Sequence, residues 1–247
     1  KRGWTTWLTG SQDPRVAAIG PTVIHVLNMP VQMDYQVDTW GDYSHQIEDY
    51  VRLGIAQDVR TEDGEELTTM IDPFSYRDQL TLPKLIFIGT NDEYWPVDAI
   101  KHYFGDIPGK KFIHYVPNAG HDLGGGQQAV QALSAFFAET LQNVPYPECQ
   151  WDFSLTENRV TLTVQVDTSK LVSAQLWQAE SDDRDFRDAL WTADDVSAQV
   201  ASPLQIEIEL PVAGYRAFYV DVIYPHPNGG DYSKSTRMFV LDDSGIL

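Results

Sequence analysis

Hydrophobic and polar positions follow two different patterns along the chain, and the first pattern extends to about residue 145. Three short runs rich in Val, Ile and Leu predict buried strands over 16–27, 82–89 and 111–116. Segments with apolar positions at helical spacing follow the second and third runs, over 96–104 and 127–141. Short apolar strands that alternate with helices are typical of a parallel α/β sheet.

Two stretches of this first part depart from the alternation. Residues 1–10 have the apolar spacing of a helix already under way, with no preceding cap and no initiator Met, and this predicts that the chain is a fragment. Residues 34–80 predict a helical insertion with an exposed acidic loop at 62–66. Its aromatic side chains are expected mainly in the core, with the lining of a pocket as the alternative, since insertions here often cover a site.

The second pattern has a period of two residues and predicts β-strands. It begins after a proline-containing linker at 143–148, and its runs lie at 160–166, 173–177, 204–210, 215–223 and 236–241. Several alternating strands at short spacing predict an all-β sandwich of the immunoglobulin or fibronectin kind. The tryptophans of this part are expected in its core or at an interface, with a sugar-binding platform as the alternative. The expected domains are 1–145, the C-terminal part of an α/β sheet, and 146–247, the β-sandwich.

Composition narrows the classes of function. The 247 residues carry 17 Lys and Arg against 36 Asp and Glu, which gives a formal net charge of −19. A chain this acidic is repelled by phosphate backbones and anionic lipids, so we expect no nucleic-acid binding and no membrane binding. The single cysteine, Cys149, excludes an intrachain disulfide and a cysteine-based zinc site. We expect no metal or other cofactor, because the acids of 182–188 lack the spacing of a calcium loop.

Two loops carry residues suited to catalysis. Asp92 lies just past one predicted strand, in 89–96, and His121 lies just past the next, in 117–126. Ligands and catalysts in open α/β sheets collect at the carboxyl ends of strands. Taken singly, the aspartate is explained as a helix cap or turn residue, and the histidine as a loop residue without a role.

As a pair, the two residues have a sharper interpretation. An acid at one strand end and a histidine at the next match the order of an α/β-hydrolase, in which the nucleophile comes first, then the acid, then the histidine. Asp92 would fix the tautomer of His121, whose other ring nitrogen would act as general base toward a serine. In this fold a helix begins directly after the nucleophile, and the chain opens with a helix. We therefore expect the serine one position before Lys1.

Three strings of sequence carry a resemblance to a known family: K-R-G-W-T-T-W-L-T-G, L-P-K-L-I-F-I-G-T-N-D-E-Y-W-P and N-A-G-H. They resemble the PhoPQ-activated pathogenicity-related proteins, an α/β-hydrolase family that is mostly bacterial and exported, over most of residues 1–145. The resemblance implies that Asp92 is the triad acid and His121 the triad base. It also implies that the backbone N–H of Lys1 forms half of an oxyanion hole, and that the protein is periplasmic or extracellular.

Two functions follow as expectations. The first is a serine hydrolase, esterase-like or peptidase-like, that acts on a small-molecule ester or amide or on a peptide. An upstream segment of the same protein would complete its sheet, so residues 1–247 alone are not expected to be a self-sufficient fold. The alternative is a non-catalytic secreted signalling or binding protein, related to virulence, on a hydrolase scaffold. The intact acid–base pair favours the hydrolase.

Overall fold

The structure of the protein is a computed structural model, which describes residues 2–24, 27–147, 149–197 and 203–247. Its elements in chain order are α1 (Arg2–Gln12), α2 (Met29–Trp40), η1 (His45–Ile47), α3 (Glu48–Arg52), α4 (Glu62–Ile71), η2 (Pro73–Gln79), β1 (Lys84–Gly89), η3 (Ala99–His102), β2 (Lys111–Val116), η4 (Leu123–Gly125), α5 (Gln127–Gln142), β3 (Cys149–Leu155), β4 (Arg159–Val166), β5 (Ser173–Ser181), β6 (Thr192–Asp195), β7 (Leu204–Glu209), β8 (Tyr215–Pro225), β9 (Asp231–Ser235), β10 (Phe239–Asp242) and β11 (Gly245–Ile246). Within these ranges, no helix has both the length and the apolar character needed to cross a membrane.

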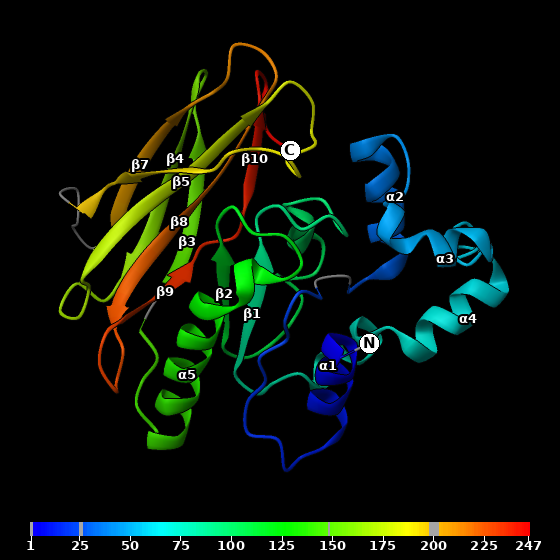
Figure 1. The fold of residues 1–247 in the computed structure, drawn as a ribbon, viewed down its shortest axis with the longest axis horizontal. Helices are drawn as coiled ribbons and strands as arrows, with labels where there is room; N and C mark the ends of the chain where they lie inside the picture. Colours follow the sequence, from blue (N-terminus) through cyan, green and yellow to red (C-terminus); the bar gives the residue numbers. More distant parts are fainter. Residues whose placement is uncertain (1, 25–26, 148, 198–202) are drawn as a thin grey trace.

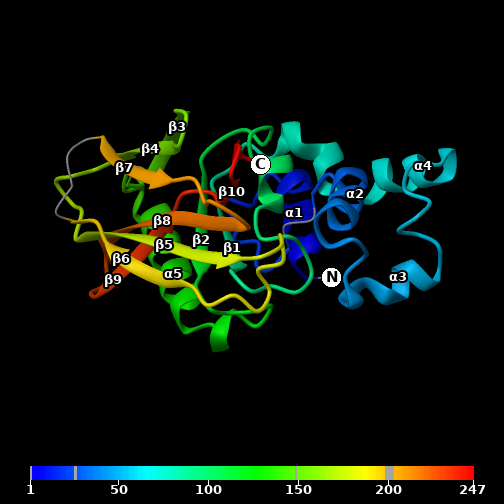
Figure 2. The same ribbon diagram turned by 90° about the horizontal axis from the view of Figure 1, so that it is seen from above.

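The inserted helices and the C-terminal strands lie on opposite sides of the two central strands. Figure 1 shows α2, α3 and α4 on one side of β1 and β2, and the C-terminal strands on the other. Seen from above in Figure 2, α3 and α4 lie at the end of the molecule opposite β4 and β7. The protein is therefore a mixed α/β fold, which confirms the predicted class at this coarse level.

Two sheets organise the strands. The larger, curled sheet has the order β1-β2-β9-β8-β10-β11, and β5 joins it through β8 and carries β6 on its other side. The pair β1–β2 is parallel, with register partners from Lys84 and Lys111 to Gly89 and Val116. The smaller sheet is antiparallel and has the order β3-β4-β7. Helix α5, predicted over 127–141, packs against β1, β2 and β9.

The prediction of a strand over 16–27 is wrong for the residues that the structure describes. This segment makes two isolated parallel bridges with β1, from Ile19 to Lys84 and from Thr22 to Phe87, and no continuous ladder. Pro21 lies between them and has no N–H to donate, so a regular ladder cannot pass through it. The segment still lies extended along β1 and extends the parallel pair.

The prediction of a helix over 96–104 is also wrong. Only the 3₁₀ helix η3, Ala99–His102, forms there. Ala99, Ile100 and Tyr103 are all fully buried. These positions have the spacing of one helix face, but the backbone leaves the helical conformation at Tyr103, where φ is −148° and ψ is −22°, so the helix ends after a single short turn.

The strands on either side of the predicted boundary at residue 145 belong to one sheet. Strand β9 pairs with β2 through Ser235 and Ile113. The segment predicted as a linker is packed as well, because Tyr146 stacks on Phe136 with ring centroids 5.3 Å apart and contacts Thr140 at 2.6 Å between the two hydroxyl oxygens. The division into 1–145 and 146–247 stays a prediction about domains, but the two parts share hydrogen bonds and core.

One hydrophobic core joins the smaller sheet to the larger one and to α5. It contains the buried members of the alternating runs on β4, β7 and β8 together with small and aromatic residues of the helix. These include Val160, Leu162, Val164, Leu204, Ile206, Ile208, Phe218, Val220, Val222, Ala132 and Phe136. The alternation read from the sequence therefore identifies the inward faces of β4 and β7 correctly.

A lysine is buried at the start of β1. The Lys84 side chain is fully buried, and its Nζ donates to the carbonyl oxygen of Pro108 at 2.7 Å. Burial, helped by the nearby Lys111 ammonium, lowers the pKa of Lys84 to about 7. An unfolded lysine keeps its proton up to about pH 10.4. Unfolding therefore takes up a proton between these two values, and the free energy of unfolding rises with pH across that window.

The substitution Lys84→Met tests the free-energy cost of burying the Lys84 ammonium. Methionine fills similar space without an ammonium to desolvate. The free energy of unfolding of the variant should therefore exceed that of the wild type most at pH 7 and below, and this difference should shrink as the pH rises. Urea denaturation from pH 6 to 9.5 measures it. Lys110→Met, at an exposed lysine nearby, is the control and should show a difference that does not change with pH. A pH-independent difference for Lys84→Met would contradict the assignment.

Candidate active site

The loops that follow β1 and β2 meet at one edge of the sheet. Gly89 and Val116, the last residues of the two strands, are register partners. Parallel strands in register end at the same edge, where the chain leaves the sheet. The loop that carries Asp92 and the loop that carries His121 therefore emerge side by side.

Asp92 and His121 are in direct contact. The Nδ1 atom of His121 lies 3.0 Å from Oδ2 and 3.3 Å from Oδ1 of Asp92. The Asp92 side chain is 2% exposed and that of His121 is 36% exposed. A buried carboxylate that accepts from Nδ1–H fixes the imidazole tautomer and leaves Nε2 for a second partner. The contact expected from the sequence is present, whereas the catalytic roles of the two residues stay a prediction.

Two residues beside Asp92 hold the histidine in place. The Tyr94 ring packs on the His121 imidazole, with centroids 4.1 Å apart and planes at 33°. The carboxylate of Glu93 accepts from the backbone N–H of His121 at 3.4 Å. Neither residue is among those predicted from the sequence to have a role. Their position next to the acid, in the same D-E-Y string, was the available signal.

A glycine permits the two loops to approach each other. A Cβ atom on Gly89 would lie 2.3 Å from the carbonyl oxygens of both Ala119 and Gly120. The Asn91 N–H donates to the Ala119 carbonyl oxygen at 2.9 Å, across the same gap. Any side chain at the end of β1 would push the histidine loop away from the acid loop, so the geometry of the pair depends on this glycine.

The first turn of α1 lies at the same place. A cavity of about 400 Å³ is lined by Arg2 from this turn and by His121, with apolar side chains of Val23, Phe87 and Leu123 among its walls. The turn fits closely because Gly3 has no side chain, since a Cβ there would lie 2.1 Å from Cγ2 of Ile24. Lys1, the predicted oxyanion donor, lies outside the described residues. Its neighbour Arg2 places the beginning of α1 beside the histidine.

His114 is not part of this arrangement. His114 is buried on β2, and its Nδ1 lies 3.2 Å from the carbonyl oxygen of Ser233. Burial lowers the pKa of His114 to about 4, so it is neutral at physiological pH. The interpretation of His114 as a core residue agrees with this environment, but only Nδ1 is satisfied, since the buried Nε2 has no hydrogen-bond partner among the described residues. His25 lies outside the described residues.

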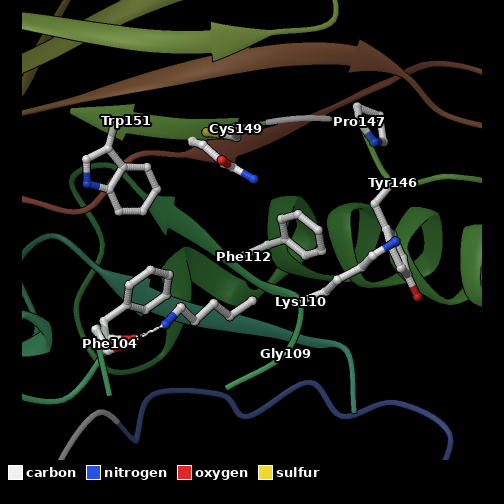
Figure 3. Close-up of a pocket in the computed structure, with 11 residues that line it drawn as sticks. Phe104, Gly109, Lys110, Phe112, Tyr146, Pro147, Cys149 and Trp151 are labelled. Atoms are coloured by element: carbon white, nitrogen blue, oxygen red, sulfur yellow. Dashed lines mark hydrogen bonds between the residues drawn. The ribbon is translucent and has the colours of Figure 1, made fainter. Parts of the chain in front are cut away.

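A larger cavity, of about 550 Å³, opens at the other end of β2. In the close-up of Figure 3, Phe104, Phe112, Tyr146 and Trp151 surround it. Phe104 and Trp151 stack with centroids 5.5 Å apart. Cys149 also lines the cavity, and burial raises the pKa of its thiol to about 12, which keeps it protonated and unreactive. This cavity lies at the start of β2 and the histidine loop at its end, so the two are separate features.

The described part of the chain contains no group of three or more His, Cys, Asp and Glu side chains placed to hold a metal ion.

Comparison with known proteins identifies the family. The profile of the PhoPQ-activated pathogenicity-related proteins matches residues 1–187 of the 247. The chain belongs to this family. The family match extends beyond the 145 residues over which the resemblance was expected, through β3, β4 and β5 and into the loop that follows β5.

A curated relative and two solved structures are also similar to this chain. Autocrine proliferation repressor protein A of Dictyostelium discoideum is 30% identical over 264 residues, covering 98% of this chain and 53% of that protein. The chain thus spans about half the length of this relative. Acetyl xylan esterase 1 of Thermoanaerobacterium sp. has a TM-score of 0.36 at 24% identity, covering 52% of this chain and 41% of that one. An esterase of Pyrococcus furiosus has a TM-score of 0.35 at 12% identity, covering 57% and 50%.

The substitution Gly89→Ala tests the close approach of the two loops. The added methyl group would overlap two backbone carbonyls, and overpacking of this kind costs about 1–3 kcal/mol. We expect a corresponding fall in the free energy of unfolding by urea denaturation, together with a longer Asp92–His121 distance in a crystal structure. Gly105→Ala is the matched control, because a Cβ there meets nothing within 4 Å. An unchanged Gly89→Ala variant would show that the loops are not packed as described.

Proposed function

We propose that this chain supplies the acid and the base of a serine hydrolase of the α/β-hydrolase fold, and that the nucleophilic serine directly precedes Lys1. The observation that carries the proposal is the 3.0 Å contact between a buried Asp92 and a partly exposed His121, in a cavity that also receives the first turn of α1. In a hydrolase of this fold the nucleophile stands where such a helix begins. The serine hydroxyl would then lie within reach of Nε2.

The proposed reaction uses each group for one task. Nε2 of His121 takes the serine proton as the hydroxyl oxygen attacks the substrate carbonyl carbon. The carbonyl π electrons move to oxygen, and the Lys1 N–H stabilises that oxyanion. Asp92, which accepts from Nδ1–H, stabilises the imidazolium that forms. The imidazolium then gives its proton to the leaving alcohol or amine as the acyl-enzyme forms, and water releases the acyl group by the same steps in reverse.

We also propose that the first part of the chain is the C-terminal part of an α/β-hydrolase sheet. The extended segment at 16–24, β1 and β2 would be the last strands of a hydrolase sheet, with α1 after the nucleophile turn and α5 after the histidine loop. An upstream segment of the same protein would complete the sheet beyond residues 16–24. The remaining C-terminal strands would form a β-sandwich, in which β3, β4 and β7 face the strands around β8. The substrate would be an ester, an amide or a peptide, and the protein would be exported.

A second candidate is a non-catalytic secreted signalling protein on the same scaffold. The name of the Dictyostelium relative, an autocrine proliferation repressor, favours it. A signalling surface has no need of an aspartate and a histidine in contact, so the two candidates differ in what the pair must do. Loss of the pair should abolish the function of a hydrolase and leave that of a binding protein intact.

A fluorophosphonate probe and an activated ester separate the two candidates. The full-length protein should be labelled by the probe and should hydrolyse the ester, and His121→Ala should abolish both because nothing then deprotonates the serine. Asp92→Asn should lower kcat by up to about 10⁴-fold, the cost of a wrong imidazole tautomer in serine proteases. His226→Ala, in the turn between β8 and β9, is the control and should retain activity.

Two results of the labelling experiment would contradict the proposal. An unlabelled, correctly folded full-length protein would exclude a serine hydrolase and favour the signalling protein. Labelling of residues 1–247 without an upstream serine would show that the nucleophile is elsewhere in this chain.

A further inference from the structure

The loop between β5 and β6, residues 182–191, runs from the C-terminal strands to the loops of the candidate site. We call it the β5–β6 loop. It is anchored in the core by Phe186 and Trp191, each 2% exposed. From there its backbone passes directly over Asn91, which adjoins Asp92, and over Asn118, three residues before His121.

Asn118 joins the β5–β6 loop to the histidine loop through its side chain. Its Oδ1 accepts from the Trp191 N–H at 2.8 Å, and its Nδ2 donates to the Trp191 carbonyl oxygen at 2.9 Å. The amide therefore pairs with one backbone residue as a neighbouring strand would. Asn118 has φ +54°, a left-handed conformation that asparagine tolerates better than most residues.

Asn91 joins the same loop to the acid loop. Its Nδ2 lies 2.8 Å from the carbonyl oxygen of Ala189 and 3.0 Å from that of Arg187, with a longer approach of 3.3 Å to that of Phe186. An amide nitrogen has two hydrogens, so the two shorter contacts use both of them. Three backbone carbonyls of one loop thus converge on a single side chain beside Asp92.

Thr90 connects the two asparagines. Its hydroxyl donates to Oδ1 of Asn91 at 2.8 Å and accepts from the N–H of Asn118 at 2.8 Å. Thr90 is 1% exposed, so its hydroxyl group is shielded from water, whereas Asn91 is half-buried and Asn118 is exposed. The hydrogen bonds of a shielded group are stronger than in water, and leaving such a group unpaired is costly.

The other side of the β5–β6 loop contacts the inserted helix α2. Nη2 of Arg184 donates to the Tyr35 hydroxyl at 2.7 Å, and the Arg187 guanidinium lies over the Trp40 ring at 4.2 Å from its centroid. The loop is therefore fixed on two sides and does not hang freely from the sheet.

We propose that Asn91 and Asn118 are positioning residues, through which the β5–β6 loop holds Asp92 and His121 at their contact distance. This inference rests on the proposed hydrolase function. The asparagines touch neither substrate nor reacting atoms, and they act by fixing the two loops on either side of Gly89. A shift of about 1 Å at a reacting group can cost on the order of 100-fold in rate.

The test uses Asn118→Gly and Asn91→Asp in the full-length protein. Glycine removes the Asn118 side chain while allowing the same positive φ. Aspartate keeps the shape of Asn91 but turns an oxygen toward the carbonyls that Nδ2 now binds. Asn228→Asp, in the exposed turn between β8 and β9, is the matched control. Each variant should lower kcat for an activated ester by about 10–100-fold with KM nearly unchanged, and the control should change neither.

A second readout does not depend on turnover. The Nδ1 proton of His121 should give a downfield NMR signal that is protected from exchange by its bond to Asp92, and this signal should weaken or vanish in Asn118→Gly and Asn91→Asp while their near-ultraviolet circular dichroism stays native. If both variants fold, keep the signal and keep kcat, the asparagines serve folding alone and the proposal is wrong.

The two readouts distinguish this proposal from the proposed function. If the wild type has no hydrolase activity, the serine hydrolase fails while the NMR comparison still tests whether the asparagines hold the pair. If Asn91→Asp does not fold, Asn118→Gly decides, because it introduces neither charge nor backbone strain.

Discussion

The parallel, in-register pairing of β1 with β2 is the constraint on which the candidate site depends. It brings the two loops out of the sheet at one edge, between the register partners Gly89 and Val116. Pairing alone would leave room for a Cβ between the loops, but the backbone of Ala119 and Gly120 occupies that space. The contact between Asp92 and His121 is possible because the loops approach this closely, with the Asn91 N–H donating to the Ala119 carbonyl oxygen at 2.9 Å. Strand register and one missing methyl group thus allow the acid and the base to meet.

The C-terminal strands are a structural part of this arrangement. Strand β9 extends the sheet from β2, and its residue Lys234 is fully buried between the α5 carboxylate of Glu139, at 3.8 Å, and the Phe112 ring, at 4.1 Å. Burial lowers the pKa of Lys234 to about 8, so removing either partner would leave a charge in the core with little to stabilise it. Strand β2 leads into the histidine loop, so the packing of β9 against β2 helps to hold this loop.

The sequence predicts the local parts of this picture and misses the long-range ones. Runs of Leu and Ile locate β1, the alternation of Leu204, Ile206 and Ile208 locates β7, and the order of Asp92 and His121 locates the pair. Strand β9 has the sequence D-Y-S-K-S, which shows no apolar alternation. It forms because it pairs with β2 on one side and β8 on the other, and not because its own sequence has an apolar and an exposed face. Asn91 and Asn118 look like ordinary turn residues, and their partners are 73 to 98 positions away in the chain. No short-range sequence pattern predicts hydrogen bonds between residues so far apart.

The environment of Asp92 is compatible with both interpretations that its position allowed. A turn aspartate accepts from the backbone two residues on, and Oδ1 does accept from the Tyr94 N–H at 2.9 Å. That bond would satisfy the local structure without any histidine. Oδ2 is nevertheless 3.0 Å from Nδ1 of His121, and the carboxylate is buried, where ionisation costs free energy unless each oxygen has a donor. The turn and the histidine therefore use different oxygens of one group, so a structural role for Asp92 does not compete with a chemical one. The turn fixes the carboxylate in the orientation that the imidazole requires.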